Sequence, residues 1–329
     1  MKMASTWQLA ALLLAGIGWQ AGAQAQTPDY PRKAVTMVVP YAAGGGTDVV
    51  ARSLAEQITR LLGQPVIIDN KPGAGGILGT AAVAKAAPDG YTVLVGLTQS
   101  LLTNQFLYEK LPYDPRKELD LVTQIATAPL MLLVPAASKI QNVADLQREM
   151  RATAAGGNCG SWGAGSYPHL TCAHMAQSWK TAITHVAYKG EAPMLQDLVG
   201  GQLGFTFASI VSAKPYLDGG KLRAIAITGE QRMPQWPALP TFAESGFADA
   251  EYRMSGWLAL AVPHGTPKPV VARLQQASQQ ALASPELAKR FEMLGMVPMG
   301  STPEQFHQSY EAAWPVWERL VKASGAKLD

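Results

Sequence analysis

A strand that turns through glycines into a helix is the feature that most constrains the fold of this chain. The apolar, β-branched run 35–39 leads through Pro40 into the loop 41–48, with the sequence Y-A-A-G-G-G-T-D, and apolar residues then recur at helical spacing. Such junctions are typical of α/β proteins, and the unpaired N–H groups of the first helical turn can bind an anion. Because the loop lacks the Gly-Lys-Ser/Thr of a nucleotide-binding P-loop, its chemistry suits a carboxylate.

Strand and helix patterns alternate along most of the chain, which predicts parallel or mixed sheets flanked by helices. Apolar runs predict strands at 35–39, 66–68, 91–95, 130–134, 205–208, 222–228 and 252–262. The segment 156–165 is rich in glycine, and we expect it to be a connection that opens a helix near Pro168.

The simplest division of the chain is discontinuous, with 26–127 and 250–329 in one domain and 128–249 in the other. Two crossings between domains make a hinge, and the cleft between the domains is then the expected ligand site. Glycine-rich strand-to-helix loops belong at this cleft because ligands of open sheets bind at the carboxyl ends of strands. Three such loops are 41–48, 157–166 and 188–193.

The N-terminus has the pattern of an export signal. Lys2 precedes an apolar core, 9–18, that is too short to span a bilayer, and Ala23 and Ala25 each end a small-x-small cleavage site. We favour cleavage after Ala25, so that residues 1–25 are the signal peptide; cleavage after Ala23 and an uncleaved helix are the alternatives. We therefore expect a soluble protein in the periplasm.

Charge excludes some classes of partner. The chain has 27 basic and 24 acidic residues and no basic run, so we expect neither nucleic acid nor an acidic membrane surface as a partner. We expect a monomer.

Cys159 and Cys172 are the only cysteines, and an exported chain with an even number invites a disulfide. Two buried thiols are the alternative. His169 and His174 lie nearby, but the spacing of these four residues matches no common metal-ligand pattern, so we expect no metal.

The residues give little support for catalysis. No Gly-x-Ser-x-Gly nucleophile motif is present. We expect His169 to donate a hydrogen bond at a helix start, and Asp48 and Asp197 to lie at helix termini in different domains. The glycines of 73–79 only approximate a dinucleotide motif, and we expect close helix packing there instead. We therefore expect no enzyme, no catalytic residue and no cofactor.

A series of short motifs in a fixed order resembles a known family. The motifs are the loop 41–48, N-K-P-G-A-G-G at 70–76, P-D-G-Y-T at 88–92, L-P-Y-D at 111–114, G-A-G-S at 163–166 with H-L at 169–170, Y-K-G at 188–190 with Pro193, D-L at 197–198, G-G-Q at 200–202, G-K-L-R-A at 220–224, P-T at 240–241 and G-T-P at 265–267. Together they resemble the Bug-type periplasmic solute receptors of tripartite tricarboxylate transport systems, over essentially the whole mature chain.

The resemblance implies a two-domain periplasmic-binding-protein fold of type II, a Venus flytrap. It also implies a carboxylate held by backbone groups of the 41–48 and 188–193 loops, partly through ordered waters. The site residues carried over by motif position are Tyr41, Gly44, Gly45, Thr47 and Asp48 in the first loop, Tyr188, Lys189, Gly190 and Pro193 in the second, and Ser161 and Ser166 lining the cleft. We further expect Gly45 to need a conformation that only glycine adopts easily.

Departures from the family pattern concern the far end of the ligand. The family commonly has aspartate where this chain has Gly204, and often an acidic or amide residue near Ala208 and Ser209, whereas Trp162 and Glu191 are individual to this chain. We expect a receptor that closes on a small organic acid and presents it to a membrane permease or a sensor protein. The alternatives are an exported α/β enzyme acting on a carboxylate and a receptor that serves signalling alone.

Overall fold

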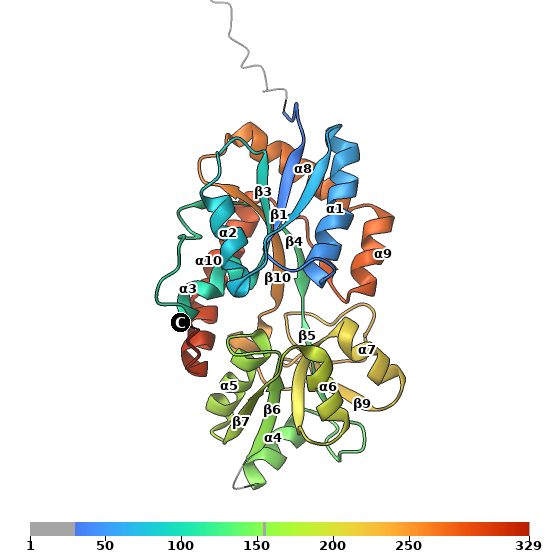
Figure 1. Ribbon diagram of the computed structural model, residues 1–329. Coiled ribbons are helices and arrows are strands. Elements are labelled where there is room, and N and C mark those ends of the chain that lie inside the picture. The colour runs from blue at the N-terminus through green and yellow to red at the C-terminus, as the bar shows by residue number, and fades with distance from the viewer. Residues whose placement is uncertain (1–29, 154–155, 329) are drawn as a thin grey trace, which may run out of the picture.

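Two mixed β-sheets flanked by helices make up the computed structural model, which describes residues 30–153 and 156–328 (Figure 1). This architecture confirms the predicted α/β class. The expected signal peptide, residues 1–25, lies outside the described residues. Within the described part of the chain, no helix combines the length and apolar character that a membrane crossing requires.

The first sheet, sheet A, has the strand order β11-β4-β10-β3-β1-β2. Strand β1 pairs in parallel with β2 and β3, and β10 pairs antiparallel with both β3 and β4. The strands are β1 (Val35–Val39), β2 (Val66–Asn70), β3 (Thr92–Leu97), β4 (Leu119–Ala128), β10 (Gly256–Pro263) and β11 (Val297–Pro298).

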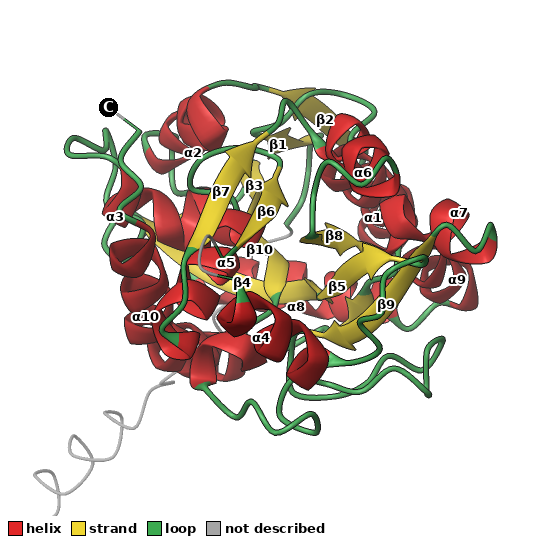
Figure 2. Ribbon diagram, turned by 90° about the horizontal axis from the view of Figure 1, so that it is seen from below, coloured by secondary structure: helices red, strands yellow, loops and turns green. Residues whose placement is uncertain are grey.

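The second sheet, sheet B, has the order β7-β6-β8-β5-β9 and repeats the plan of sheet A (Figure 2). Its strands are β5 (Leu130–Pro135), β6 (Gly157–Ser161), β7 (Ile183–Ala187), β8 (Phe205–Ser209) and β9 (Leu222–Ile227). Three parallel strands, β7, β6 and β8, are followed by antiparallel β5 and then β9, as β2, β1 and β3 are followed by β10 and β4. The chain passes between the sheets from β4 to β5 and again after β9.

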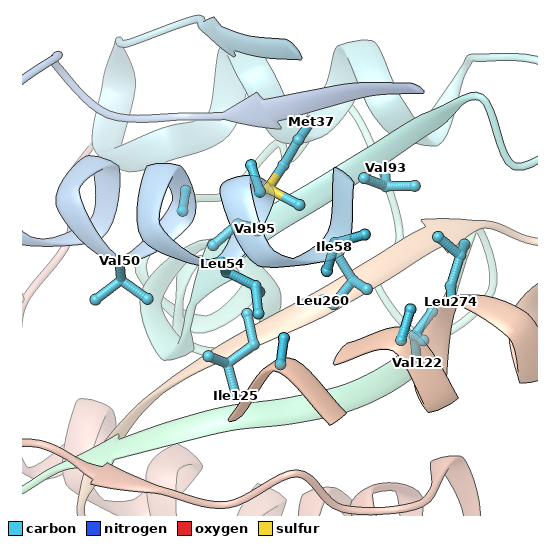
Figure 3. Close-up of a cluster of buried hydrophobic side chains, with 14 of the residues drawn as sticks. Met37, Val50, Leu54, Ile58, Val93, Val95, Val122, Ile125, Leu260 and Leu274 are labelled. Atoms are coloured by element: carbon cyan, nitrogen blue, oxygen red, sulfur yellow. The ribbon is translucent and has the colours of Figure 1, made fainter. Parts of the chain in front are cut away.

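Helices cover both faces of each sheet (Figure 1). They are α1 (Gly46–Leu62), α2 (Ile77–Ala84), α3 (Asn104–Leu107), α4 (Val143–Ala152), α5 (Tyr167–Trp179), α6 (Glu191–Val199), α7 (Ile210–Asp218), α8 (Lys268–Leu282), α9 (Pro285–Met293) and α10 (Pro303–Ser324). Val50, Leu54 and Ile58 recur every four residues and place one buried face of α1 on sheet A, against Val95 and Leu260 (Figure 3).

The two halves of the molecule are joined by helix packing as well as by the chain crossings. Leu170 of α5 lies in one core cluster with Trp317 of α10. The ring of Tyr167 meets the Trp317 ring edge to face, 5.0 Å between centroids, and its hydroxyl donates to the carbonyl of Met254. The α5 helix is therefore anchored to the half that carries both the first and the last described elements.

Strand β4 was missing from the sequence-based expectations, and its register explains why. Its larger buried apolar residues, Leu119, Val122 and Ile125, recur every three positions, which is not the two-residue period of a regular strand. The pairing with β10 shifts register at Val122 and Ile125, which have no partner on β10. These bulges insert extra residues and turn a two-residue alternation into a three-residue one.

Strand β6 corrects the expectation of a glycine-rich connection at 156–165, because Gly157–Ser161 is a strand. A Cβ at Gly157 would stand 2.2 Å from Sδ of Met150, and one at Gly160 would stand 2.6 Å from Cδ1 of Leu203. These glycines therefore serve close packing inside a strand. The strand expected over 252–262 instead begins at Gly256, because 250–253 form a short 3-10 helix.

Candidate functional site

The loop between β1 and α1 is folded around the buried carboxylate of Asp48. One oxygen, Oδ2, accepts the N–H of Gly44 at 2.8 Å and Nε of Arg52 at 2.9 Å, and the other accepts Nδ2 of Asn70 at 2.9 Å. Burial raises the pKa of Asp48, but these hydrogen bonds outweigh it and lower the pKa to about 2. Asp48, expected as a ligand contact, therefore shapes the loop from inside.

The outer side of this loop is backbone. Gly44 has a φ of +82°, a left-handed conformation that favours glycine, and Gly45 caps α1 without any side-chain hydrogen bond. The N–H groups of the first turn of α1 are thus left for a ligand or water. The Thr47 hydroxyl, in the same turn, makes no hydrogen bond to any described residue.

Tyr41 supports the neighbouring loop. Its hydroxyl is buried without a hydrogen-bond partner in the described structure, and a Cβ at Gly76 would lie 2.9 Å from it. Burial raises the pKa of Tyr41 above its ordinary value. The phenol therefore packs under the 73–76 segment, and only the Tyr41 backbone belongs to the exposed loop.

The loop between β7 and α6 is also mainly backbone. Tyr188 donates from its hydroxyl to Oδ2 of Asp197 at 2.8 Å, and burial together with that carboxylate raises the pKa of Tyr188 to about 12. Lys189 is exposed and forms no ion pair with any described residue. Gly190, with a φ of +112°, precedes α6 without a side-chain cap, and Pro193 is exposed in the first turn.

The serines of the third loop are used inside it. Ser161 is fully buried, and its Oγ lies 2.6 Å from Nε2 of His185 and donates to the carbonyl of Gly163. Ser166 donates to the same carbonyl at 2.6 Å. A serine hydroxyl has a single proton, so with that proton donated to the Gly163 carbonyl, the Ser161 oxygen accepts the hydrogen of the bond to His185 Nε2. Both serines, expected to line the cleft, therefore brace the loop.

His169 acts differently from the expectation. Its Nδ1 accepts the N–H of Gly165 at 3.1 Å, so the ring accepts rather than donates at this helix start. Its ring stacks on His185, 3.8 Å between centroids. Burial, with a contribution from His185, lowers the pKa of His169 to about 4, which keeps the ring neutral and able to accept. His185 was not singled out by the sequence, because only the pairing of β6 with β7 brings it to this loop.

A disulfide joins Cys159 of β6 to Cys172 of α5, with 6.3 Å between their Cα atoms. It joins residues 13 positions apart in the sequence, with the 161–166 loop between them. Together with the two histidines, it fixes the start of α5 against sheet B. Among the described residues, no three or more His, Cys, Asp or Glu side chains are grouped so that they could hold a metal ion.

The three loops follow the carboxyl ends of parallel strands, β1 in sheet A and β6 and β7 in sheet B. Strands β6 and β7 are neighbours, so the 161–166 and 188–193 loops lie together, and the N–H of Tyr188 donates to the carbonyl of Ser161 at 2.9 Å. In Figure 1 the start of α1 lies at the lower end of the upper half and α6 at the upper end of the lower half. No hydrogen bond or ion pair between described residues joins the 41–48 and 188–193 loops. We call these two loops the walls of the candidate site.

Glu191 is a polar residue of this region whose contacts the sequence did not reveal. Its carboxylate accepts the N–H of Ser209 at 2.8 Å and the Ser209 hydroxyl at 2.7 Å, and it also accepts the hydroxyl of Ser212. Sequence separation hides this cluster, because the start of α6 meets the start of α7 only after β8 has been placed in the sheet.

Comparisons with known proteins agree with this geometry. A sequence family described as "Tripartite tricarboxylate transporter family receptor" matches residues 50–326. Protein BugT of Bordetella pertussis is 32% identical over 329 residues, which is all of both chains.

Solved structures give the same result. The periplasmic binding protein BugD is 33% identical with a TM-score of 0.73 and covers 91% of this chain and 99% of its own. A protein of R. palustris solved with adipate is 34% identical, with a TM-score of 0.77, over 91% and 100% of the two chains. MatC of Rhodopseudomonas palustris, solved with malate, is 34% identical, with a TM-score of 0.72, over 89% and 100%. The predicted two-domain fold of a periplasmic binding protein is confirmed.

Proposed function

Because the chain belongs to the tripartite tricarboxylate transporter family of receptors, we propose that it is a periplasmic receptor that captures a small organic carboxylate between two domains. Members of this family are solute-binding receptors and not enzymes, which confirms the expectation that this chain is not an enzyme. In this proposal residues 1–25 are removed on export, 26–127 and 250–329 form one domain, and 128–249 form the other.

The observation that carries the proposal is the state of three helix N-termini. The helices α1, α5 and α6 follow the carboxyl ends of β1, β6 and β7, and each begins without a side-chain cap. Of the other helices, α4, α7, α9 and α10 are capped by Asn142, Ser209, Ser284 and Thr302, whereas α2 and α8 are uncapped. Uncapped N-termini leave N–H donors and a positive helix end for an anion, and a carboxylate satisfies both.

The N–H donors at these helix N-termini also explain why the two walls would close on the ligand. A carboxylate that touches both the α1 and the α6 N-termini binds the closed form better than the open one, and so shifts the population toward closure. The closed form would then be presented to a membrane permease of the transport system. Titrations with relatives' ligands, adipate and malate, are a natural starting point, since similar receptors were solved with them.

A thermal-shift screen over dicarboxylates, tricarboxylates and aromatic acids, followed by calorimetry, tests the proposal. The best acid should bind, and its neutral amide should bind at least about tenfold more weakly, because backbone donors and helix ends favour the charged form. Equal binding of acid and amide, or no binding by any acid, would contradict the proposal.

The same calorimetry measures the effect of Lys189→Ala on the affinity for the acid. If backbone groups hold the carboxylate, removal of this exposed and unpaired lysine should weaken binding by about threefold at most, as expected for a screened surface charge. Arg148→Ala on α4, away from the loops, is the matched control for loss of one positive charge. Abolition of binding by Lys189→Ala alone would show that a side chain, and not the backbone, holds the acid.

A further inference from the structure

Glu191 spans the edge of sheet B at which the proposed site lies. It is the first residue of α6 and follows β7, whereas its partner Ser209 ends β8 and Ser212 lies in the first turn of α7. Since β7, β6 and β8 are adjacent in that order, the carboxylate reaches from the end of the first of these strands to the end of the third. The Glu191 carboxylate thus lies at the start of α7, bonded to Ser209, whose hydroxyl caps this helix, and to the Ser212 hydroxyl.

The charge of Glu191 is hydrogen-bonded but not paired with a cation. A carboxylate has about four acceptor positions, and Ser209 and Ser212 fill three of them. No lysine, arginine or histidine of the described chain forms an ion pair with Glu191, and the exposed Lys189, two residues earlier, is not bonded to it. Glu191 remains partly exposed, with about one acceptor position left.

A second carboxylate would be repelled at this wall. The uncapped N-termini of α1, α5 and α6 attract one anionic group, whereas α7, the third helix that starts at this edge of sheet B, is capped by Ser209 and carries the Glu191 carboxylate. An anion brought beside Glu191 would meet a like charge, whereas an N–H or O–H group could donate to its free acceptor position. The solved relatives with adipate and malate hold dicarboxylic acids, so the two ends of their ligands are both acidic.

We propose that Glu191 determines specificity by rejecting a second carboxylate, so that this receptor prefers a monocarboxylate whose far end carries a hydrogen-bond donor such as an amide, hydroxyl or ammonium group. This inference rests on the proposed function, since it concerns the far end of the acid that the receptor captures.

Matched ligand pairs test the preference in the unmodified protein. Each pair is a dicarboxylic acid and its half-amide, succinate with succinamate, glutarate with glutaramate and adipate with adipamate, so that length is varied while one end changes from O⁻ to NH₂. Calorimetry on the pair that binds best should give a dissociation constant about tenfold lower for the half-amide. Because this ratio needs no variant, poor folding of a variant leaves the test intact.

Glu191→Gln then assigns the preference to this residue. The variant keeps the size and one acceptor oxygen but removes the charge, and the half-amide and the diacid should bind with nearly equal affinity, a loss of the roughly tenfold preference. Glu149→Gln on α4 is the control, because it removes one exposed negative charge of the same half and should leave the ratio unchanged. Circular dichroism checks that both variants are folded.

The outcomes separate the two proposals. If acids bind but the diacid binds as well as the half-amide, or if Glu191→Gln leaves the ratio unchanged, the role of Glu191 is overturned and the proposed function stands. If neither these pairs nor any acid of the screen binds, the proposed function falls and this inference falls with it.

Discussion

At the scale of single residues, two adjacent glycines of the first loop have different tasks. Gly44 has a φ of +82°, which an L side chain rarely adopts, whereas Gly45 has a φ of −73° in ordinary extended backbone. The expectation that Gly45 needs a glycine conformation is therefore wrong. The strained position is its neighbour, because the Gly44 N–H has to turn inward to reach Asp48.

Alanine at each position should show which of the two glycines is required for its backbone conformation. Gly44→Ala should cost about 1–2 kcal/mol of unfolding free energy, the usual cost of a left-handed L residue, and should weaken ligand binding by disturbing the loop. Gly45→Ala should change stability by about 0.5 kcal/mol at most, since its Cβ would make only a 3.4 Å contact with the carbonyl of Ala42. Urea denaturation of both variants measures the difference, and equal costs would contradict the assignment.

Asp48 should make stability depend on pH in acid. Its pKa in the folded protein, about 2, lies below the ordinary value of 3.8, so its stabilising contribution is complete above 3.8 and is lost as the pH falls toward 2. Asp48→Asn should cost about 1–3 kcal/mol at neutral pH, the loss of charge-assisted hydrogen bonds to Gly44 and Asn70. Arg52 also bonds to this carboxylate, and because its own side chain is about half exposed, solvent screening reduces its share. Urea denaturation from pH 7 to pH 2 should show a flatter profile for the variant, and parallel profiles would count against this account.

At the scale of elements, the β6–α5 unit is the most heavily braced part of the proposed site. The disulfide, the stacked pair His169 and His185, and the two serines that share the Gly163 carbonyl all act on one short connection. Such bracing holds the N-terminus of α5 in place before any ligand arrives, which lowers the ordering cost of binding.

Removing the disulfide should therefore weaken both stability and binding. Thiol labelling of denatured, unreduced protein should find no free thiol, because Cys159 and Cys172 are bridged. The double variant Cys159→Ala, Cys172→Ala should lose about 3 kcal/mol of unfolding free energy on the chain-entropy account of a short closed loop. Two labels per chain in the denatured, unreduced protein without these substitutions would show that the bridge is absent.

The sequence predicts an element well where the signal for it is local. The strand-to-helix loops at 41–48 and 188–193 were located because glycines and apolar periodicity are local signals. Strand β4 has no such signal, since its bulges hide the period of two, and β6 has the glycine content of a connection because its glycines accommodate the distant side chains of Met150 and Leu203. The contacts of Glu191 and His185 could not be predicted either, because they depend on which strands become neighbours.

At the scale of the whole molecule, the two similar sheets lie in separate halves (Figure 1). The helices α5 and α10 pack together and join these halves on one side. The α5–α10 packing adds to the two direct chain crossings, which lie at Pro129 and after β9. Motion of one half against the other is therefore confined to a hinge rather than free in all directions.

Ligand should make the molecule more compact in solution. Small-angle X-ray scattering with saturating acid should give a smaller radius of gyration than the free protein, because in the proposed function both loops contact the same carboxylate. The neutral amide of that acid, at the same concentration, is the control and should leave the scattering unchanged. An unchanged radius with a bound acid would mean that capture does not require closure.

The position of β10 has a consequence for the order in which the molecule can be made. This strand lies between β3 and β4 in the middle of sheet A, yet the chain reaches it only at Gly256–Pro263, after all of sheet B has been synthesised. An emerging chain can complete sheet B once Ile227 is free, whereas β1, made first, belongs to a sheet that still lacks its centre. We therefore expect sheet B to be complete before sheet A during synthesis, although β1 of sheet A is made first.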